Sequence, residues 1–127
     1  MTLTPAPASI QRATVERYLE LINSGTAEAI AALYTADATV EDPAGTPPKV
    51  GRAAIADFYE GAAALDCTTT LLTYRESGQT AAFHFRVSTK LPDSTVDVSP
   101  IDVMTFDKDG NITSMKAIFS EGDYEIK

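Results

Sequence analysis

Two aspartates and three tyrosines carry most of the chemistry that this sequence can offer. Asp102 lies within the apolar run VSPIDVMTF, and Asp42 precedes a proline in the stretch VEDPAG. Tyr18, Tyr34 and Tyr59 each fall on the apolar stripe of a predicted helix. Phenols and a carboxylic acid buried in one apolar chamber can direct hydrogen-bond donors at a common point, which is what an oxyanion hole requires. The residues therefore indicate a site that stabilises negative charge.

Asp102 has two interpretations. Strand side chains alternate between faces, so Asp102 shares its face with Val98, Pro100, Met104 and Phe106. An ionised carboxylate on such an apolar face either takes up a proton or finds strong donors. The structural alternative is a carboxylate bonded to backbone amides at a bulge forced by Pro100, which has no amide hydrogen. The sequence is compatible with both.

The other candidates also have structural interpretations. A carboxylate before proline, such as Asp42, most often ends a strand or caps a turn. Glu41 is its neighbour, and in an extended segment the two side chains point to opposite sides, so only one can enter a cavity. A tyrosine on a helix stripe packs as a phenylalanine does, and its hydroxyl finds a carbonyl.

Composition excludes several classes of function. The chain has ten basic against 18 acidic residues, with a net charge of −8 and no basic stripe, which argues against nucleic-acid binding. Cys67 is the only cysteine and His84 the only histidine, so disulfide frameworks and metal sites built on several such ligands are excluded. A Cys67–His84 nucleophilic pair is conceivable, but nothing near Cys67 suggests an activated thiolate. We therefore expect no metal site.

Hydrophobic periodicity predicts three helices before a run of strands. The first helix covers about residues 9–24, the second begins at Thr26 and ends near residues 35–38, and the third covers about 52–64. Residues 39–41 could form a short strand, and the loop EDPAGTPPKVG follows it. Alternating patterns predict strands near 67–76, 79–90, 94–106 and 111–120.

Helices gathered before strands that short turns connect indicate an α+β fold, with three N-terminal helices packed on a curved, mostly antiparallel sheet. A length of 127 residues fits a single domain over 1–127, in which residues 1–8 form a frayed lead-in. No apolar run is long enough to span a bilayer, and the first residues do not read as a signal peptide, so we expect a cytoplasmic protein without membrane contacts.

Four segments resemble the bacterial steroid Δ5-3-ketoisomerases, or ketosteroid isomerases. RYLELINSG, LYTADATVEDPAG, GRAAIADFYEG and SPIDVMTFDKDG match that family in order and in register, from about residue 11 to about residue 121. The segments GAAALDCTTT and LPDST match less well. The resemblance implies a cone-shaped fold around an apolar cavity, a small-molecule steroid substrate and no cofactor.

The resemblance also implies roles for individual residues. Asp42 would be the base, Tyr18 and Asp102 the oxyanion hole, and Tyr34 and Tyr59 a supporting hydrogen-bond network. A protonated aspartate of this kind is a known property of the family. The positions expected to contact the substrate are Phe58, Phe85, Met104, Met115 and Phe119.

The implied reaction moves a C=C bond from Δ5 to Δ4 of a 3-ketosteroid by proton transfer from C4 to C6 through a dienolate. One alternative keeps the cone fold but changes the reaction to a cyclisation, dehydration or epoxide opening, which tends to use a His-Asp dyad or an arginine among acids. His84 and Arg86 should face away from the cavity, which disfavours it. The other alternative is a non-catalytic carrier of steroid-like ligands or a dimerisation module.

We also expect a homodimer, since the family forms one and the outer sheet face is unusually apolar. The outer-face residues predicted from the alternation are Ile101, Val103, Ile112 and Ile118.

Overall fold

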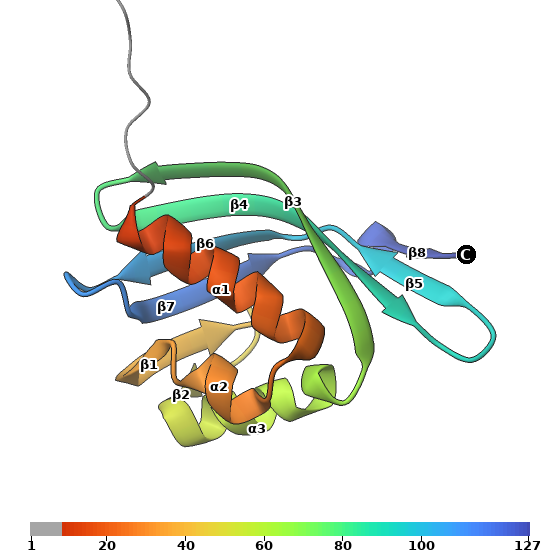
Figure 1. Ribbon diagram of the computed structural model, residues 1–127, viewed down its shortest axis with the longest axis horizontal. Helices are drawn as coiled ribbons and strands as arrows, with labels where there is room; N and C mark the ends of the chain where they lie inside the picture. Colours follow the sequence, from red (N-terminus) through yellow and green to blue (C-terminus); the bar gives the residue numbers. More distant parts are fainter. Residues whose placement is uncertain (1–8) are drawn as a thin grey trace, which may run out of the picture.

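The computed structural model describes residues 9–127, and the predicted lead-in at residues 1–8 lies outside the described residues. Figure 1 shows three helices on the concave side of a long, curved sheet. The helices are α1 (Ile10–Ser24), α2 (Ala27–Ala31) and α3 (Arg52–Ala63), and a 3-10 turn, η1 (Glu121–Asp123), comes late in the chain. The strands are β1 (Tyr34–Glu41), β2 (Lys49–Val50), β3 (Asp66–Ser77), β4 (Thr80–Lys90), β5 (Thr95–Val98), β6 (Ile101–Phe106), β7 (Ile112–Ile118) and β8 (Tyr124–Ile126). The predicted α+β fold class is confirmed.

The sheet is antiparallel except at one pair of strands. Its order is β2-β1-β7-β6-β4-β5-β8, with β3 paired to β4, and only β1 and β7 run parallel among the described strands. The first half of β4 pairs with β6 and its second half with β5. One long strand therefore continues along two successive partners, and the inward side chains of its later part, Phe85, Val87 and Thr89, line a cavity wall.

Helix α1 begins and ends where the sequence predicts. The Ser9 hydroxyl accepts a hydrogen bond from the Arg12 amide at 3.0 Å, which caps the helix. At the other end the Gly25 amide donates to the Leu21 carbonyl at 2.7 Å, and a Cβ at position 25 would lie 2.5 Å from Leu21 Cδ2. Only glycine fits this close approach without displacing Leu21.

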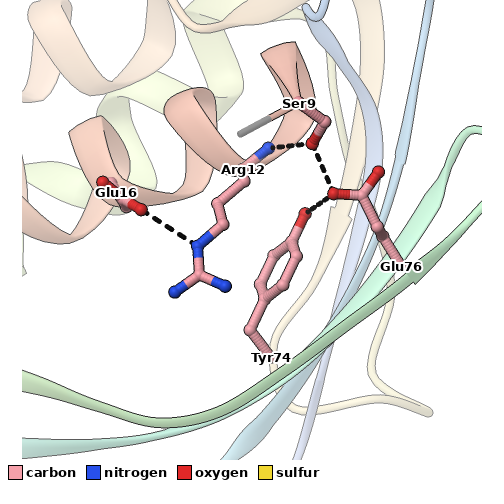
Figure 2. Close-up of polar contacts among 5 residues, drawn as sticks. All are labelled: Ser9, Arg12, Glu16, Tyr74 and Glu76. Atoms are coloured by element: carbon pink, nitrogen blue, oxygen red, sulfur yellow. Dashed lines mark hydrogen bonds and ion pairs between the residues drawn. The ribbon is translucent and has the colours of Figure 1, made fainter. Parts of the chain in front are cut away.

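A polar cluster fixes the start of α1 on β3 (Figure 2). The Ser9 hydroxyl donates to Glu76, and the Tyr74 hydroxyl donates to the same carboxylate oxygen at 3.1 Å. The Arg12 guanidinium lies 4.9 Å from the centre of the Tyr74 ring and also pairs with Glu16 at 3.0 Å. Exposed pairs of this kind contribute little individually, about 0–1 kcal/mol each. Together they connect the first turn of α1, the helix that carries Tyr18, to β3.

The prediction that Tyr34 lies on a helix is wrong. Helix α2 ends at Ala31, and Tyr34 is the first residue of β1, where it pairs in parallel with Ile112. The Ile112 amide donates to the Leu33 carbonyl at 2.8 Å, so the chain leaves the helix to join β7. Tyr34 is nevertheless fully buried, as its apolar surroundings predicted.

The strand predicted over residues 94–106 is two strands. Pro100 cannot donate to a ladder, and its carbonyl accepts from the Phe85 amide at 3.2 Å between β5 and β6. The last predicted strand ends at Ile118, and η1 and β8 were not predicted at all.

Ile112 was assigned to the wrong face of the sheet. The pairing of β6 with β7 skips one residue, because Thr105 pairs with Ser114 and Phe106 with Ile112. This bulge reverses the alternation, and Ile112 is fully buried.

Candidate active site

An apolar cavity of about 320 Å³ opens between the helices and the inner face of the sheet. Helices α1 and α3, the loop after β1, strands β3 to β7 and β8 all contribute to its wall. The lining residues are Tyr18, Ile22, Asp42, Phe58, Tyr59, Ala62, Leu65, Cys67, Phe85, Val87, Thr89, Val98, Pro100, Asp102, Ala117, Phe119 and Tyr124. Its volume lies in the range of small-molecule sites.

Asp102 faces this cavity from β6 and is 1% exposed. Among residues 9–127 its Oδ1 has no hydrogen-bond partner, so the structural interpretation, a carboxylate held by backbone amides, does not account for this oxygen. Burial, and then the negative charge of Asp42, raise the pKa of Asp102 well above its usual value. A raised pKa favours the protonated, neutral form of Asp102, which is a hydrogen-bond donor. The buried Oδ1 of this group has no partner in the described protein to which it is already bonded.

The three tyrosine hydroxyls form a chain in the core. The Tyr34 and Tyr59 hydroxyls lie 2.7 Å apart, and those of Tyr59 and Tyr18 lie 3.0 Å apart. Burial is the largest cause that raises the pKa of all three phenols, which stay protonated at neutral pH. If Tyr34 donates to Tyr59 and Tyr59 to Tyr18, the Tyr18 proton is free to point into the cavity. Tyr34 does not line the cavity, so it can act only through Tyr59.

Asp42 enters the cavity from the loop after β1, and Glu41 turns away from it. The Glu41 carboxylate pairs with Lys116 at 3.3 Å, as the alternation of an extended segment requires. The loop is held to β7 by a hydrogen bond from the Ala44 amide to the Ala117 carbonyl at 2.8 Å. Burial raises the pKa of Asp42 to about 6, although Lys49 opposes the shift. Asp42 is thus mostly ionised at neutral pH and poised as a base.

The wall predicted for the substrate is partly different from the observed one. Phe58, Phe85 and Phe119 line the cavity. Met104 and Met115 do not: they pair with each other across β6 and β7 and are fully buried in the core. Met104 follows the lining residue Asp102 by two positions on β6, and Met115 precedes the lining residue Ala117 by two positions on β7. Contact of these two methionines with a substrate stays a prediction, and the cavity does not support it.

Several lining residues were missed. Val98 and Pro100 could have been found, because they share the predicted face of Asp102. Cys67 and Thr89 lie opposite each other on β3 and β4, in a Thr-rich stretch without a clear apolar alternation. Tyr124 belongs to β8, a three-residue strand that carries no periodic signal.

The histidine and its neighbouring arginine face the other side of the sheet, as predicted. His84 and Arg86 line a polar pocket on the outer face together with Asp97 and Ser99. Within residues 9–127 no group of three or more His, Cys, Asp or Glu side chains is placed to hold a metal ion. No helix in that part of the chain has the length and hydrophobicity needed to cross a membrane.

Comparison with known proteins identifies the family. Residues 15–115 match the SnoaL-like domain. Over 115 residues the chain is 51% identical to the steroid Delta-isomerase of Nocardioides simplex, a match that covers 91% of this chain and 94% of that protein. The chain belongs to the ketosteroid isomerase family.

Two solved structures share the ketosteroid isomerase fold. The epoxide hydrolase/cyclase-like enzyme SalBIII, with a role in pyran ring formation in the polyether salinomycin, superposes with a TM-score of 0.85 at 24% identity, covering 92% of this chain and 95% of that one. The protein RV0760c of Mycobacterium tuberculosis gives 0.87 at 19% identity, covering 97% and 100%. At these identities the likeness concerns the fold alone.

In this member of the ketosteroid isomerase family, the two carboxyl groups of the cavity differ in their tendency to ionise. Asp42 and Asp102 line one cavity, and the negative charge of Asp42 disfavours ionisation of Asp102. Because an ionised Asp42 is one of the causes that raise the pKa of Asp102, the two carboxyl groups favour different protonation states, with Asp42 ionised and Asp102 protonated. Pairs of titratable groups whose surroundings separate their pKa values are typical of acid-base catalysis.

Proposed function

We propose that this protein is a steroid Δ5-3-ketoisomerase. The observation that carries the proposal is one apolar cavity lined by two carboxyl groups, Asp42 and Asp102, beside the Tyr18 phenol, with burial raising the pKa of both carboxyl groups. The steroid Delta-isomerase of Nocardioides simplex, 51% identical over most of the chain, supports the same activity. A flat, four-ring hydrocarbon skeleton fits a cavity walled by Phe58, Phe85 and Phe119.

In the proposed reaction Asp42 removes a proton from C4, next to the C3 carbonyl, and returns it to C6 on the same face of the steroid. A carbon acid of this kind is far weaker than a carboxylic acid. Transfer is therefore feasible only if fixed donors stabilise the charge that develops on the carbonyl oxygen in a dry site. Tyr18 and Asp102 are the proposed donors, and the Tyr34–Tyr59 chain holds the Tyr18 hydroxyl in position.

The proposal is tested by ultraviolet absorbance of the conjugated enone formed from androst-5-ene-3,17-dione. We expect catalysed formation of the Δ4 isomer by the native protein without any added cofactor. If the steroid binds at saturation and no enone accumulates above the buffer rate, the protein is a carrier and the isomerase proposal is wrong.

We also propose that the protein forms a homodimer through the outer face of the sheet. Ile101 and Ile118 pair across β6 and β7 on that face and are 45% and 48% exposed. Adjacent exposed isoleucines on a regular sheet are unusual without a covering partner. Light scattering at micromolar concentration should give twice the chain mass, and Ile101→Lys should give the monomer. A monomeric native protein would overturn this proposal.

A further inference from the structure

The wall of the cavity holds a second polar position, far from the two aspartates. Thr89 and Cys67 lie opposite each other on β4 and β3, and the Thr89 Oγ1 is 3.5 Å from the Cys67 Sγ. Both residues line the cavity, and Cys67 is 5% exposed. A thiol is a weak hydrogen-bonding partner, so the Thr89 hydroxyl keeps most of its capacity to donate and accept.

The position of Thr89 follows from the register of β4. Phe83, at one end, pairs with Asp102, and Thr89 is six residues farther along the same strand. Strands rise about 3.3 Å per residue, so the two positions are separated by about 20 Å, less where the sheet curves. Phe85 and Val87 point into the cavity between them. This span can hold the length of a four-ring skeleton with a hydrogen bond at each end.

We propose that the Thr89 hydroxyl binds an oxygen substituent on the substrate ring remote from the reacting carbonyl, and so determines substrate specificity. The proposal rests on the proposed isomerase function, because the reacting carbonyl sets the orientation of the substrate. A remote ketone accepts a hydrogen bond from Thr89 while the Cys67 thiol donates to the Thr89 oxygen. A remote hydroxyl group can either donate or accept there. A bare CH₂ leaves Thr89 with its weak thiol partner alone.

Tyr124 is the competing polar group at the cavity wall. Its ring packs edge-on against Phe119, with ring centres 5.9 Å apart, and the residue is 46% exposed. Water can satisfy a phenol hydroxyl at that exposure whether or not a ligand is bound. Loss of this hydroxyl should therefore not discriminate between ligands that differ only in the remote oxygen.

Equilibrium binding of two non-reacting ligands tests the proposal without relying on turnover. The ligands are androst-4-ene-3,17-dione and androst-4-en-3-one, which carry a ketone or a CH₂ at C17. Their Kd values are measured for the native protein and for Thr89→Val, which keeps the shape and β-branching of threonine. We expect the ratio of the two Kd values to shift by about 3- to 10-fold against the diketone, the size of one neutral hydrogen bond.

Three further variants complete the test. Thr89→Ser should keep the native ratio, and so should Thr68→Val, the same chemical change at an exposed position of β3. Tyr124→Phe should also keep it. An unchanged ratio in Thr89→Val, or a shift of equal size in Tyr124→Phe, would overturn the proposal. Failure of the isomerase function has a different signature: no enone forms from androst-5-ene-3,17-dione, whatever the binding ratios are.

Discussion

Two buried aspartates of the same sheet have opposite protonation behaviour. Asp102 on β6 faces the inner cavity and is 1% exposed, and Asp97 on β5 faces the outer pocket and is 7% exposed. Burial and the charge of Asp42 raise the pKa of Asp102. The Ser88 hydroxyl and then the Lys127 ammonium, 3.0 Å away, lower the pKa of Asp97. Depth alone therefore does not set the charge of a carboxylate here; its partners do.

The difference has a functional meaning. On the outer face the acid is an ionised partner in a surface ion pair, which stabilises a fold modestly. On the inner face no cation is among the causes that shift the pKa of Asp102, and we propose that this acid keeps a proton that it donates to a ligand. A protonated carboxylic acid in an apolar chamber costs the fold free energy, so it is expected where binding or catalysis uses it.

The largest effect is expected when the base of the inner face is removed. Asp42→Asn should lower kcat by about 10⁴-fold, the upper end for one acid-base group, because the amide cannot accept the C4 proton. Steroid affinity should be unchanged or higher, since shape and polarity are kept. Asp97→Asn, the same change on the outer face, should alter kcat by less than about twofold. Near-native turnover in a homogeneous Asp42→Asn sample would remove Asp42 from the mechanism.

The next largest effect is expected when Asp102 is truncated, with truncation of Asp97 as the matched control. Asp102→Ala should lower kcat by about 10²–10³-fold, the usual loss for one oxyanion donor, with a smaller change in KM. Asp102→Asn should be milder, because an amide can still donate. Asp97→Ala should leave steady-state kcat within about twofold of the native value. Equal losses from Asn and Ala at position 102 would show that donation from this residue is not used.

The pH profile separates the two acids of the inner face. Asp42 is the active base only when ionised, and its pKa is about 6. We expect kcat/KM to be level above that pH and to fall tenfold per pH unit below it. The pKa of Asp102 is also raised well above its usual value, so we expect Asp102 not to produce the fall. A profile that follows an ordinary carboxyl pKa near 4 would mean that the base is more exposed to water than Asp42 is.

The sequence predicted the inner face of the sheet better than the outer face. Alternation in residues 98–106 was sufficient to put Asp102, Pro100 and Val98 on one apolar face, since β-strand geometry is local. The same rule failed at Ile112, where a bulge that depends on the partner strand reverses the alternation. Local pattern does not report such a register shift.

The resemblance to ketosteroid isomerases supplied what local pattern could not. Asp42, read alone, favoured a structural role, because nothing in VEDPAG reveals a cavity on one side of the loop. Asp97 had no signal at all: its partner Lys127 lies beyond β8, a strand too short to be recognised from periodicity. Contacts between segments distant in the chain are tertiary information, and the chain of Tyr34, Tyr59 and Tyr18 hydroxyls is of the same kind.

The smallest effect concerns stability, and here the two aspartates should have opposite slopes with pH. The raised folded pKa of Asp102 means that its protonated form favours the fold fully below the unfolded pKa near 3.8, and that this advantage is lost as pH rises. The amide that Asp102→Asn introduces does not ionise in this pH range, so the variant has no such pH-dependent loss of stability. Relative to the native protein, its Tm should therefore increase between pH 4 and pH 8, by about 4 °C for each kcal/mol of penalty removed.

Lys127→Ala tests the pH dependence expected from Asp97. The Tm values of this variant, of Asp102→Asn and of the native protein are measured by calorimetry between pH 4 and pH 8. The lowered folded pKa of Asp97 gives stability that is present above pH 3.8 and is lost as pH falls through the folded pKa. Removing the ammonium should lower Tm slightly at neutral pH and leave it unchanged in acid, because a protonated Asp97 no longer attracts the cation. The Tm difference between variant and native protein then shrinks with acidification for both variants, but with opposite signs. If both differences had the same sign, the two carboxyl groups would carry the same charge, and their surroundings would not separate them.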